Sequence, residues 1–202
     1  MIEIVEKPDW VSWDEVADVV HAAHAENRKK GILMRYAQMS GDEMRQRIEN
    51  QGVMLVAMDD KRVVGTMGMK SKMLPNPCWY GTGEVAYTCF GAILPEYMGK
   101  GVFRQISKKS EQIVRQWGLN RIMFDTNAAN KHLIKINQKA GYKLVKYKYN
   151  YGHASVVAIK WLDGCPYPDW KVNYQYIKSK YKTKWELLKQ RIFHKSTDAE
   201  NI

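Results

Sequence analysis

The sequence predicts an α/β (α+β) domain built on a mixed β-sheet. Residues 53–58, 63–70 and 85–94 form three apolar segments that follow one another closely, which predicts an antiparallel meander. A helical stretch then separates 85–94 from the apolar segment 121–126. Strands joined through a helix run parallel, so the sheet should contain both kinds of pairing, with helices on its faces.

Two helices are expected before the first of these strands. Ser12-Trp13-Asp14-Glu15 has the capping-box pattern and should open a helix that continues to about Lys30. One face of this helix should carry Val16, Val19, Val20, Ala23 and His24, which are spaced three or four residues apart or adjacent across a turn. Ser40-Gly41-Asp42-Glu43 repeats the capping signal for a second helix through Glu49, and residues 31–39 form the loop between the two helices.

The remaining elements complete the sheet. Residues 59–62 join the first two strands as a hairpin, and the proline- and glycine-bearing segment 73–83 is a longer loop. After the strand at 121–126, the pattern predicts a helix over 131–139. A last hairpin then follows, formed by strands 142–149 and 153–161.

A glycine-bearing turn lies between the strand 85–94 and a helix expected over 102–117. It reads Pro95-Glu96-Tyr97-Met98-Gly99-Lys100-Gly101. The first N–H groups of a helix have no intrahelical partners, and that end carries partial positive charge. Gly99 and Gly101 let the backbone approach a ligand closely. The turn therefore predicts a phosphate or pyrophosphate site, with a merely tight connection as the alternative.

In this region the chain resembles the GNAT superfamily of acyl-CoA-dependent N-acyltransferases. The segment from Leu94 to Val102 is similar to the family's pyrophosphate loop. Asn130, eleven residues before Gly141-Tyr142, is similar to the family's asparagine-to-Gly-aromatic segment. Order and spacing agree over about residues 1–160, and the specific motifs lie within 93–142.

The resemblance implies the GNAT fold, with a mixed sheet of about six to seven strands and acetyl-CoA as co-substrate. Strands 85–94 and 121–126 would splay apart to admit the pantetheine arm, whose amides would pair with the backbone like an added strand. A backbone N–H near Ile93 would face the thioester oxygen. The implied cofactor-binding residues are Gly91, Ala92, Ile93, Met98, Gly99, Lys100, Gly101, Val102, Phe103, Arg104 and Asn130. For Asn130, helix capping alone is the alternative role.

Three positions depart from the family pattern. Glu96 stands where the family often has Arg or Gln, and Phe103 stands where it often has a further glycine. A cradle made of backbone N–H groups survives both changes. Asn137 occupies the position at which many members place a tyrosine that protonates the leaving thiolate. That acid must therefore come from another group or from water.

The implied reaction is direct attack of an amine on acetyl-CoA through a tetrahedral intermediate. An alkylammonium with a pKa of about 10 must first lose a proton, usually to a carboxylate. Glu84, at the start of the strand 85–94, is the candidate base, and solvation of a strand end is its alternative role. The nearest hydroxyls for a general acid are those of Tyr87, Tyr142 and Tyr147, although aromatic residues in strands usually belong to the core.

The expected acceptor is a primary amine of a small molecule, with a preference for an amino sugar or a nucleotide-linked amino sugar. A protein or peptide amine stays open as the acceptor. A catalytically weak CoA-binding or interaction module with the GNAT fold also stays open. The acceptor pocket would be lined by Met34, Arg35, Tyr36, Trp79, Tyr80, Tyr149 and Tyr151. This lining suits a sugar or an acidic small molecule as well as a peptide amine.

Composition places the chain among single-domain proteins. A length of 202 residues with 45% hydrophobic content suffices for one sizeable core. No apolar stretch reaches the ~18 residues of a membrane span, and the first residues lack a signal pattern, so we expect a cytoplasmic protein. Cys78, Cys89 and Cys165 form no metal-binding or disulfide pattern, so we expect no metal.

The net charge of +11 concerns partners rather than the fold. Lys100, Arg104, Lys108 and Lys109 cluster on and before the helix that follows the glycine turn. They could attract the phosphates of CoA, or could simply form a solvated face. The sequence has none of the zinc-finger, basic-zipper or RNA-recognition patterns that would favour nucleic acid.

We expect a GNAT-like domain over residues 1–161, followed by a separate C-terminal region. Residues 162–195 should form a linker and a basic amphipathic helix, and 196–202 a disordered tail. The apolar stripe of that helix comprises Trp170, Tyr174, Ile177, Tyr181, Trp185, Leu188 and Ile192. Three roles stay open: packing on the domain or on a second subunit as a homodimer, lying on an anionic membrane or a membrane-bound complex, and contacting an acidic substrate or nucleic acid.

Overall fold

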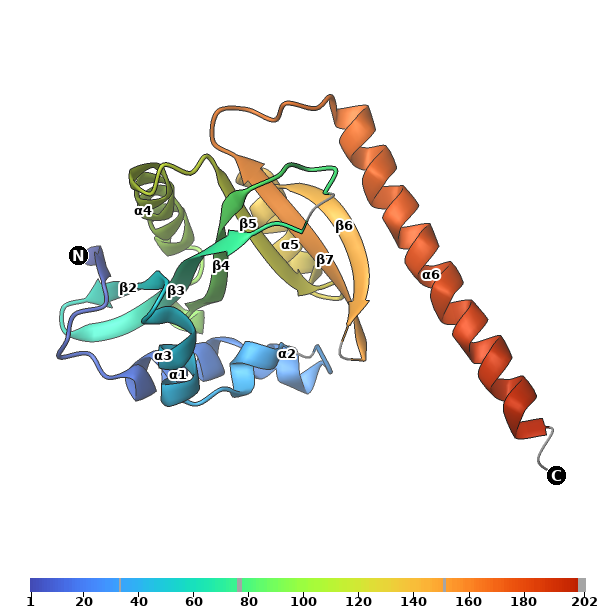
Figure 1. Cartoon of the computed structure of the whole chain (residues 1–202). Helices are drawn as coiled ribbons and strands as arrows, with labels where there is room; N and C mark the ends of the chain where they lie inside the picture. Colours follow the sequence, from blue (N-terminus) through green and yellow to red (C-terminus); the bar gives the residue numbers. More distant parts are fainter. Residues whose placement is uncertain (33, 76–77, 151, 200–202) are drawn as a thin grey trace. The chain divides into compact units, whose positions relative to one another are not determined.

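The computed structural model describes residues 1–32, 34–75, 78–150 and 152–199. Its seven-stranded mixed sheet has the order β1-β2-β3-β4-β5-β7-β6 (Figure 1). The elements are β1 (Ile2–Glu6), α1 (Trp13–Ala23), α2 (Ala25–Lys29), η1 (Arg35–Gln38), α3 (Gly41–Ile48), β2 (Gly52–Asp59), β3 (Arg62–Met73), β4 (Glu84–Ile93), η2 (Pro95–Tyr97), α4 (Val102–Gln116), β5 (Arg121–Asn127), α5 (Lys131–Lys139), β6 (Lys143–Asn150), β7 (His153–Trp161) and α6 (Asp169–Ala199). The chain forms two compact units: Met1–Phe124 with Lys160–Gly164, and the remaining residues.

The first unit contains the antiparallel meander. β1 pairs with β2, β2 with β3 and β3 with β4, all antiparallel, and β4 pairs with β5 in parallel. The predicted meander and the predicted parallel pair are therefore confirmed, while β1 is an additional strand. α1 and α3 cover one face of β2–β4 and α4 covers the other (Figure 1).

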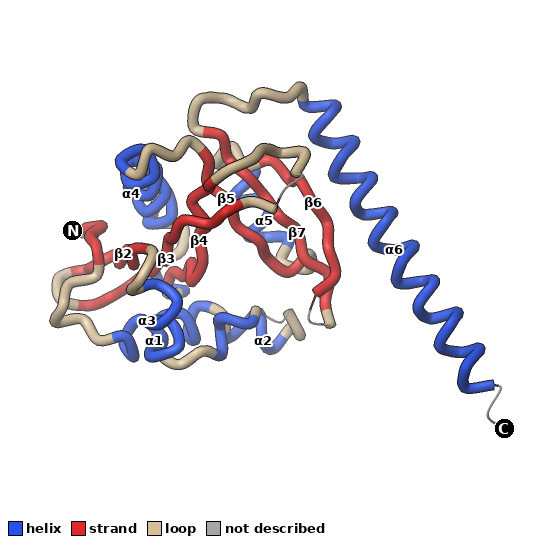
Figure 2. The backbone as a smooth tube through the Cα atoms, in the orientation of Figure 1, coloured by secondary structure: helices blue, strands red, loops and turns tan. Residues whose placement is uncertain are grey.

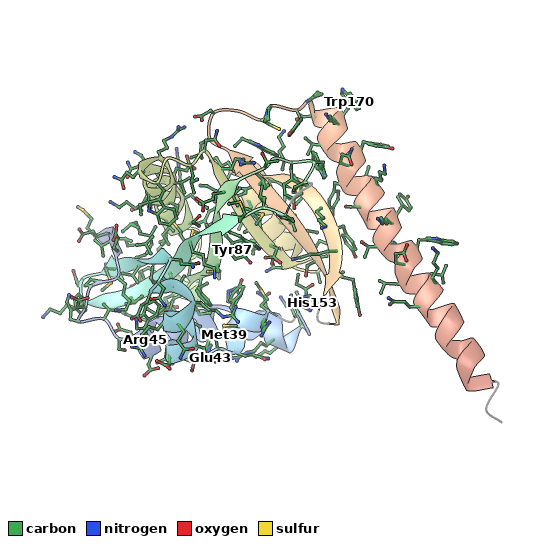
Figure 3. All side chains as sticks on the ribbon, in the orientation of Figure 1. Met39, Glu43, Arg45, Tyr87, His153 and Trp170 are labelled. Carbon is green, nitrogen blue, oxygen red and sulfur yellow. The ribbon has the colours of Figure 1, made fainter. Side chains whose placement is uncertain are left out.

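The N-terminal helix is shorter than expected. It was expected to continue to about Lys30, but α1 ends at Ala23 and α2 begins at Ala25. His24 interrupts it with a ψ of 5°, outside regular helical geometry. The second capping signal is confirmed, because Ser40 and Glu43 make both hydrogen bonds of a capping box at the start of α3. Figure 3 labels Glu43 there.

The second unit contains the last hairpin, which α5 and α6 accompany. β6 and β7 pair antiparallel, as predicted, and Figure 2 traces them as two neighbouring strands. Ala128, Ile134 and Val156 form a buried cluster in this unit. Tyr147 of β6 donates its backbone N–H to the Ser179 hydroxyl at 2.8 Å, and its carbonyl accepts from Thr183 at 3.2 Å. Two α6 side chains thus satisfy backbone groups on the open edge of β6.

α6 is the longest helix in the described part of the chain (Figure 1). It extends to Ala199, beyond the expected boundary at residue 195, and the last part of the expected tail, residues 200–202, lies outside the described residues. Among the described helices, none is both long enough and apolar enough to cross a membrane.

Candidate functional site

A β-bulge interrupts β4 shortly before its end. Thr66 pairs with Ala92 and Gly68 with Cys89, so two residues of β4 lie opposite one residue of β3. One of the two, Phe90, has a φ of 53°, which a residue with a large side chain rarely adopts. A bulge bends its strand and redirects the backbone groups that follow it. Here the bulge includes Gly91, the first of the predicted pantetheine-binding residues.

Side chains from two other elements hold the carbonyls of this bulge. The buried Thr66 hydroxyl donates to the Phe90 carbonyl at 2.7 Å. His24 Nε2 lies 3.1 Å from the Gly91 carbonyl oxygen. A carbonyl can only accept, so Nε2 carries the proton. The Gly91 carbonyl, expected to be open to the cofactor, therefore already has one protein donor, and its second lone pair can take another.

The surroundings of His24 keep its imidazole neutral. Its side chain is buried, and burial lowers its pKa below the ordinary value more than the bond to Gly91 raises it. Nδ1 lies 3.2 Å from the Asn27 amide nitrogen, which donates to it. The ring also makes an edge contact with Tyr36, which in turn contacts Phe90. Both ring nitrogens are engaged, so His24 positions the bulge and is unsuited to act as a base.

The parallel pairing between β4 and β5 is short. In the described part of the chain its register consists of Ala86 with Ile122 and Tyr87 with Met123. β4 then continues to Ile93. The end of β4 therefore extends well past the paired region, as the predicted splaying requires.

The glycine turn connects β4 to α4 as predicted. Gly99 and Gly101 have φ values of 77° and 80°, in the left-handed region that favours glycine. Gly101 is the N-cap residue of α4, and no side chain caps the helix there. A Cβ atom added at either glycine would meet no atom within 4 Å. The turn thus borders open space at the positive end of a 15-residue helix, which suits an anion.

Contacts with β2 and β3 anchor this turn. Glu96 forms an ion pair with Arg62 at 2.8 Å, with both side chains exposed. The Tyr97 hydroxyl donates to Asp59 at 2.8 Å, and this bond lowers the pKa of the Asp59 carboxyl and raises that of Tyr97. The Lys100 ammonium lies 4.9 Å from the Tyr97 ring centre. Glu96, a departure from the family pattern, thus serves as an anchor.

The other predicted cofactor-binding residues of the first unit lie around the turn. Ala92 and Val102 are buried, whereas Gly91, Ile93 and Phe103 are half-buried. The exposed residues are Met98, Gly99, Lys100, Gly101 and Arg104. Lys108 is also exposed, and Lys109 is half-buried. Cationic side chains therefore border the open end of α4.

Glu84 is exposed at the first position of β4. Its backbone is fixed by the Arg121 guanidinium, which donates to the carbonyls of Glu84 at 3.3 Å, Tyr80 at 3.5 Å and Thr82. Glu84 lies seven positions before Gly91 on β4, or roughly 20 Å of extended chain. A proton taken from an amine near the bulge would therefore reach this carboxylate only through a chain of several waters.

Two asparagines of the second unit have structural partners. The Asn130 side chain caps α5 by accepting from the Leu133 N–H at 3.2 Å. The buried Asn137 amide donates to the Leu133 carbonyl at 2.9 Å. An amide held in this way supplies no acidic proton. Asn137 thus offers no replacement for the tyrosine that many GNAT proteins have at this position.

The tyrosines considered as general acids are mostly packing residues. Tyr142 is buried, and Tyr147 packs against the core cluster of the second unit. Tyr87 is half-buried on β4 (Figure 3), with the Lys72 ammonium 4.5 Å from its ring centre.

The predicted acceptor-pocket residues lie on several segments. Trp79 and Tyr80 stack edge to face in the loop before β4. Met34, Arg35 and Tyr36 precede or begin the short helix η1. Tyr149 belongs to β6 of the second unit, and Tyr151 lies outside the described residues.

Cysteine, histidine and acidic side chains are the possible metal ligands in the described part of the chain. Cys78, Cys89 and Cys165 are half-buried and form no disulfide. Within residues 1–32, 34–75, 78–150 and 152–199, no group of three His, Cys, Asp or Glu side chains could hold a metal ion.

Sequence reasoning missed the contact between His24 and Gly91. It placed His24 on the apolar face of the first helix with its valines. A polar side chain on an otherwise apolar helical face needs a buried hydrogen-bond partner, and this was the available signal. The partner is 67 positions away in the chain, so spacing alone could not identify it.

Comparison with known proteins gives one family. The sequence model of the "Acetyltransferase (GNAT) family" matches residues 17–142. A search of curated proteins found no match.

Solved structures resemble the chain in fold. An acetyltransferase of the GNAT family from Staphylococcus aureus Mu50 has a TM-score of 0.62 at 14% identity, covering 80% of this chain and 99% of that one. A GNAT family acetyltransferase from Elizabethkingia anophelis with acetyl-CoA bound has a TM-score of 0.56 at 11% identity, and the match covers 80% of this chain and 98% of that one. The PaiA N-acetyltransferase from Thermoplasma acidophilum in complex with coenzyme A has a TM-score of 0.58 at 17% identity, and the match covers 80% of this chain and 99% of that one.

Proposed function

The chain belongs to the acetyltransferase (GNAT) family, and we propose that it transfers an acetyl group from acetyl-CoA to the primary amine of a small molecule. The observation that carries the proposal is the turn at Gly99 and Gly101. It offers an uncapped helix N-terminus, two glycines in left-handed conformation and open space where their side chains would lie. Two structures of similar fold hold acetyl-CoA or coenzyme A, which supports the same ligand here.

Backbone groups would hold most of the cofactor. The N–H groups from Gly99 to Arg104 would bind the pyrophosphate, assisted by the cations of Lys100 and Arg104. The pantetheine amides would pair with β4 from Gly91 to Ile93, beyond the segment that pairs with β5. Asn130 is proposed as a further cofactor-binding residue, although its side-chain oxygen caps α5.

The reaction needs one base, one oxyanion donor and one acid. We assign the base to Glu84, acting through water on the ammonium of the acceptor. The neutral amine then attacks the thioester carbon, and a backbone N–H near Ile93 stabilises the oxygen that becomes negative. When the carbon–sulfur bond breaks, the attacking nitrogen loses its remaining extra proton to water, and the leaving thiolate takes a proton from water, since Asn137 cannot supply one.

The charge of the chain bears on the class of acceptor. The net charge of +11 favours an acceptor that carries a negative group, such as a nucleotide-linked amino sugar. A peptide amine is the second candidate, and a panel of acceptors containing both classes separates them. Acceptor-dependent release of CoA thiol with amino sugars but not with lysine peptides supports the first.

The test of cofactor binding is calorimetric titration of acetyl-CoA into the wild type and into Gly101→Trp. The matched control is Gly118→Trp, because Gly118 also has a left-handed φ of 71°, follows the other end of α4 and has no atom within 4 Å of an added Cβ. We expect tight binding by the wild type and by the control, and loss of binding in Gly101→Trp. Absence of binding in the folded wild type would refute the proposal.

A second measurement separates an enzyme from a CoA-binding module. The same protein is incubated with acetyl-CoA and the acceptor panel, and the released thiol is measured. Binding of acetyl-CoA with no thiol release above the protein-free rate, across all amines, identifies the chain as a binding module. Release that saturates with one amine identifies it as a transferase.

A further inference from the structure

One narrow face of α6 packs against the rest of the second unit, to which the helix itself belongs. Val172 is 1% exposed, and Tyr176, Ser179 and Thr183 are half-buried. Ser179 and Thr183 make the hydrogen bonds to Tyr147 of β6. These four positions follow each other at intervals of four, three and four residues, so they lie on one side of the helix.

A second apolar face of α6 is exposed. Its first residue, Trp170, is labelled in Figure 3. The exposed fractions along this stripe are 71% for Trp170, 55% for Tyr174, 49% for Ile177, 70% for Tyr181, 56% for Trp185 and 48% for Leu188. At about 100° per residue, these six residues fall within roughly 80° of the helix circumference. The stripe is nearly opposite the packed face, so α6 does not bury it against its own unit.

Lysines border this stripe on both sides. By the same geometry, Lys171, Lys178, Lys182 and Lys189 lie on one side of the stripe, and Lys180 and Lys184 lie on the other. The Lys178 and Lys189 ammonium groups are 5.9 and 5.7 Å from the ring centres of Tyr174 and Trp185. The acidic residues Asp169 and Glu186 lie closer to the packed face.

This distribution of charge decides between the partners that could cover the stripe. In a pair formed by two copies of the helix, the lysines that border each stripe would face the lysines of the other copy. Like charges at close range oppose such pairing. Nucleic acid would require cations at the centre of the contact, where α6 has apolar and aromatic residues. An anionic lipid surface suits both parts of this face, because its apolar region can take up the aromatic centre and its phosphates can bind the lysines at the borders.

We propose that α6 binds to anionic phospholipid membranes, lying parallel to the surface with its aromatic stripe inserted at the headgroup level. Trp and Tyr prefer this interfacial depth. Lysines at the borders of the stripe can extend their ammonium groups to the phosphates while their aliphatic stems stay in apolar surroundings. The proposal is independent of the acetyl transfer reaction and places the enzyme at a membrane surface.

The test is co-sedimentation of the full chain with large vesicles of phosphatidylcholine alone or with 30% phosphatidylglycerol. We expect at least about tenfold tighter binding to the anionic vesicles, weakened by salt, with a blue shift of tryptophan fluorescence. Equal binding to the two vesicle types, or no binding to either by a protein with intact helical circular dichroism, overturns the proposal. A concentration-dependent dimer that replaces vesicle binding also overturns it.

Two pairs of variants locate the contact. Tyr181→Ser with Trp185→Ser removes the centre of the stripe, and Lys180→Gln with Lys184→Gln removes one border. The matched charge control is Lys131→Gln with Lys135→Gln, two exposed lysines of α5. We expect both α6 pairs to lose at least about fivefold in affinity for the anionic vesicles, with less than twofold loss in the control. Equal losses in the control pair would indicate general charge attraction and overturn the assignment to α6.

Discussion

The imidazole of His24 donates from Nε2 to the carbonyl of Gly91, 3.1 Å away. This bond joins the residue between α1 and α2 to the bulge of β4. The bulge residue Gly91 and the two residues after it, Ala92 and Ile93, form the segment proposed to bind the pantetheine arm. A side chain remote in sequence therefore holds the backbone that is proposed to meet the thioester.

Replacing His24 by Ala removes this donor. We expect the free energy of unfolding to fall by about 1–3 kcal/mol, because a partly buried carbonyl loses its partner. The kcat/KM for acetyl transfer should fall more than acetyl-CoA affinity, since the turn at Gly99 and Gly101, proposed to bind the pyrophosphate, is untouched. Urea denaturation, steady-state kinetics and calorimetry measure the three quantities.

The control is His21→Ala. His21 lies on the same helix and its Nε2 is 2.9 Å from the Met39 carbonyl oxygen, away from the bulge. It should lose stability while keeping kcat/KM within about twofold, and His24→Gln, whose amide can donate, should recover part of the loss. A similar fall of kcat/KM in His21→Ala would show that the effect is general destabilisation.

His24 also predicts how stability depends on pH. Burial lowers the pKa of the folded imidazole below the ordinary value of 6.5. As the pH falls below about 6.5, the unfolded chain therefore binds a proton that the folded protein does not yet bind, and unfolding becomes easier. We expect the thermal midpoint to decrease between pH 7 and pH 5.5, and to decrease less in His24→Asn.

The exposed His132 provides the control for this pH dependence. The His132→Asn variant should keep the wild-type slope. Asp59 and Glu96 do not interfere, because their folded pKa values are lowered from 3.8 and 4.5, and their contribution is lost only at more acidic pH. An unchanged slope in His24→Asn would contradict the assignment.

Two buried threonines should respond oppositely to replacement by valine. Thr66 donates to the Phe90 carbonyl, so Thr66→Val should cost about 1–3 kcal/mol of unfolding free energy. The buried hydroxyl of Thr126 has no hydrogen-bond partner among the described residues. Thr126→Val should therefore leave stability unchanged or raise it. Urea denaturation of both variants provides the comparison, and equal losses would contradict it.

Local patterns were sufficient to predict most of the fold. The helix Lys131–Lys139 has its predicted bounds, and the capping box at Ser40 forms as its sequence indicates. The strands of the hairpins and of the strand–helix–strand crossover pair with strands that are close in sequence, so their pairing could be predicted from chain order. The glycine turn was likewise predictable, because Gly99 and Gly101 occur beside a helix start.

Features that depend on distant contacts could not be predicted. The break at His24 coincides with a side-chain bond to Gly91, 67 positions away, which no local pattern contains. The bulge at Phe90 lies in a segment whose composition suits a regular strand. The stripe on α6 could be predicted, but its exposure could not, because Ser179 and Thr183 gave no apolar signal for the packed face.

The last prediction concerns the proposed base. Glu84→Gln keeps the size of the side chain but cannot accept a proton, so kcat should fall by about 10²-fold with an alkylamine acceptor. Acetyl-CoA affinity should be unchanged in calorimetry.

The exposed Glu3 of β1 is the control, and Glu3→Gln should retain full activity. With an acceptor amine that is already neutral at pH 7, the defect of Glu84→Gln should shrink, because no proton has to be removed before attack. An equal defect with both acceptors would mean that Glu84 acts by supporting the strand end that Arg121 holds, and a rate unchanged with both would remove it from the reaction.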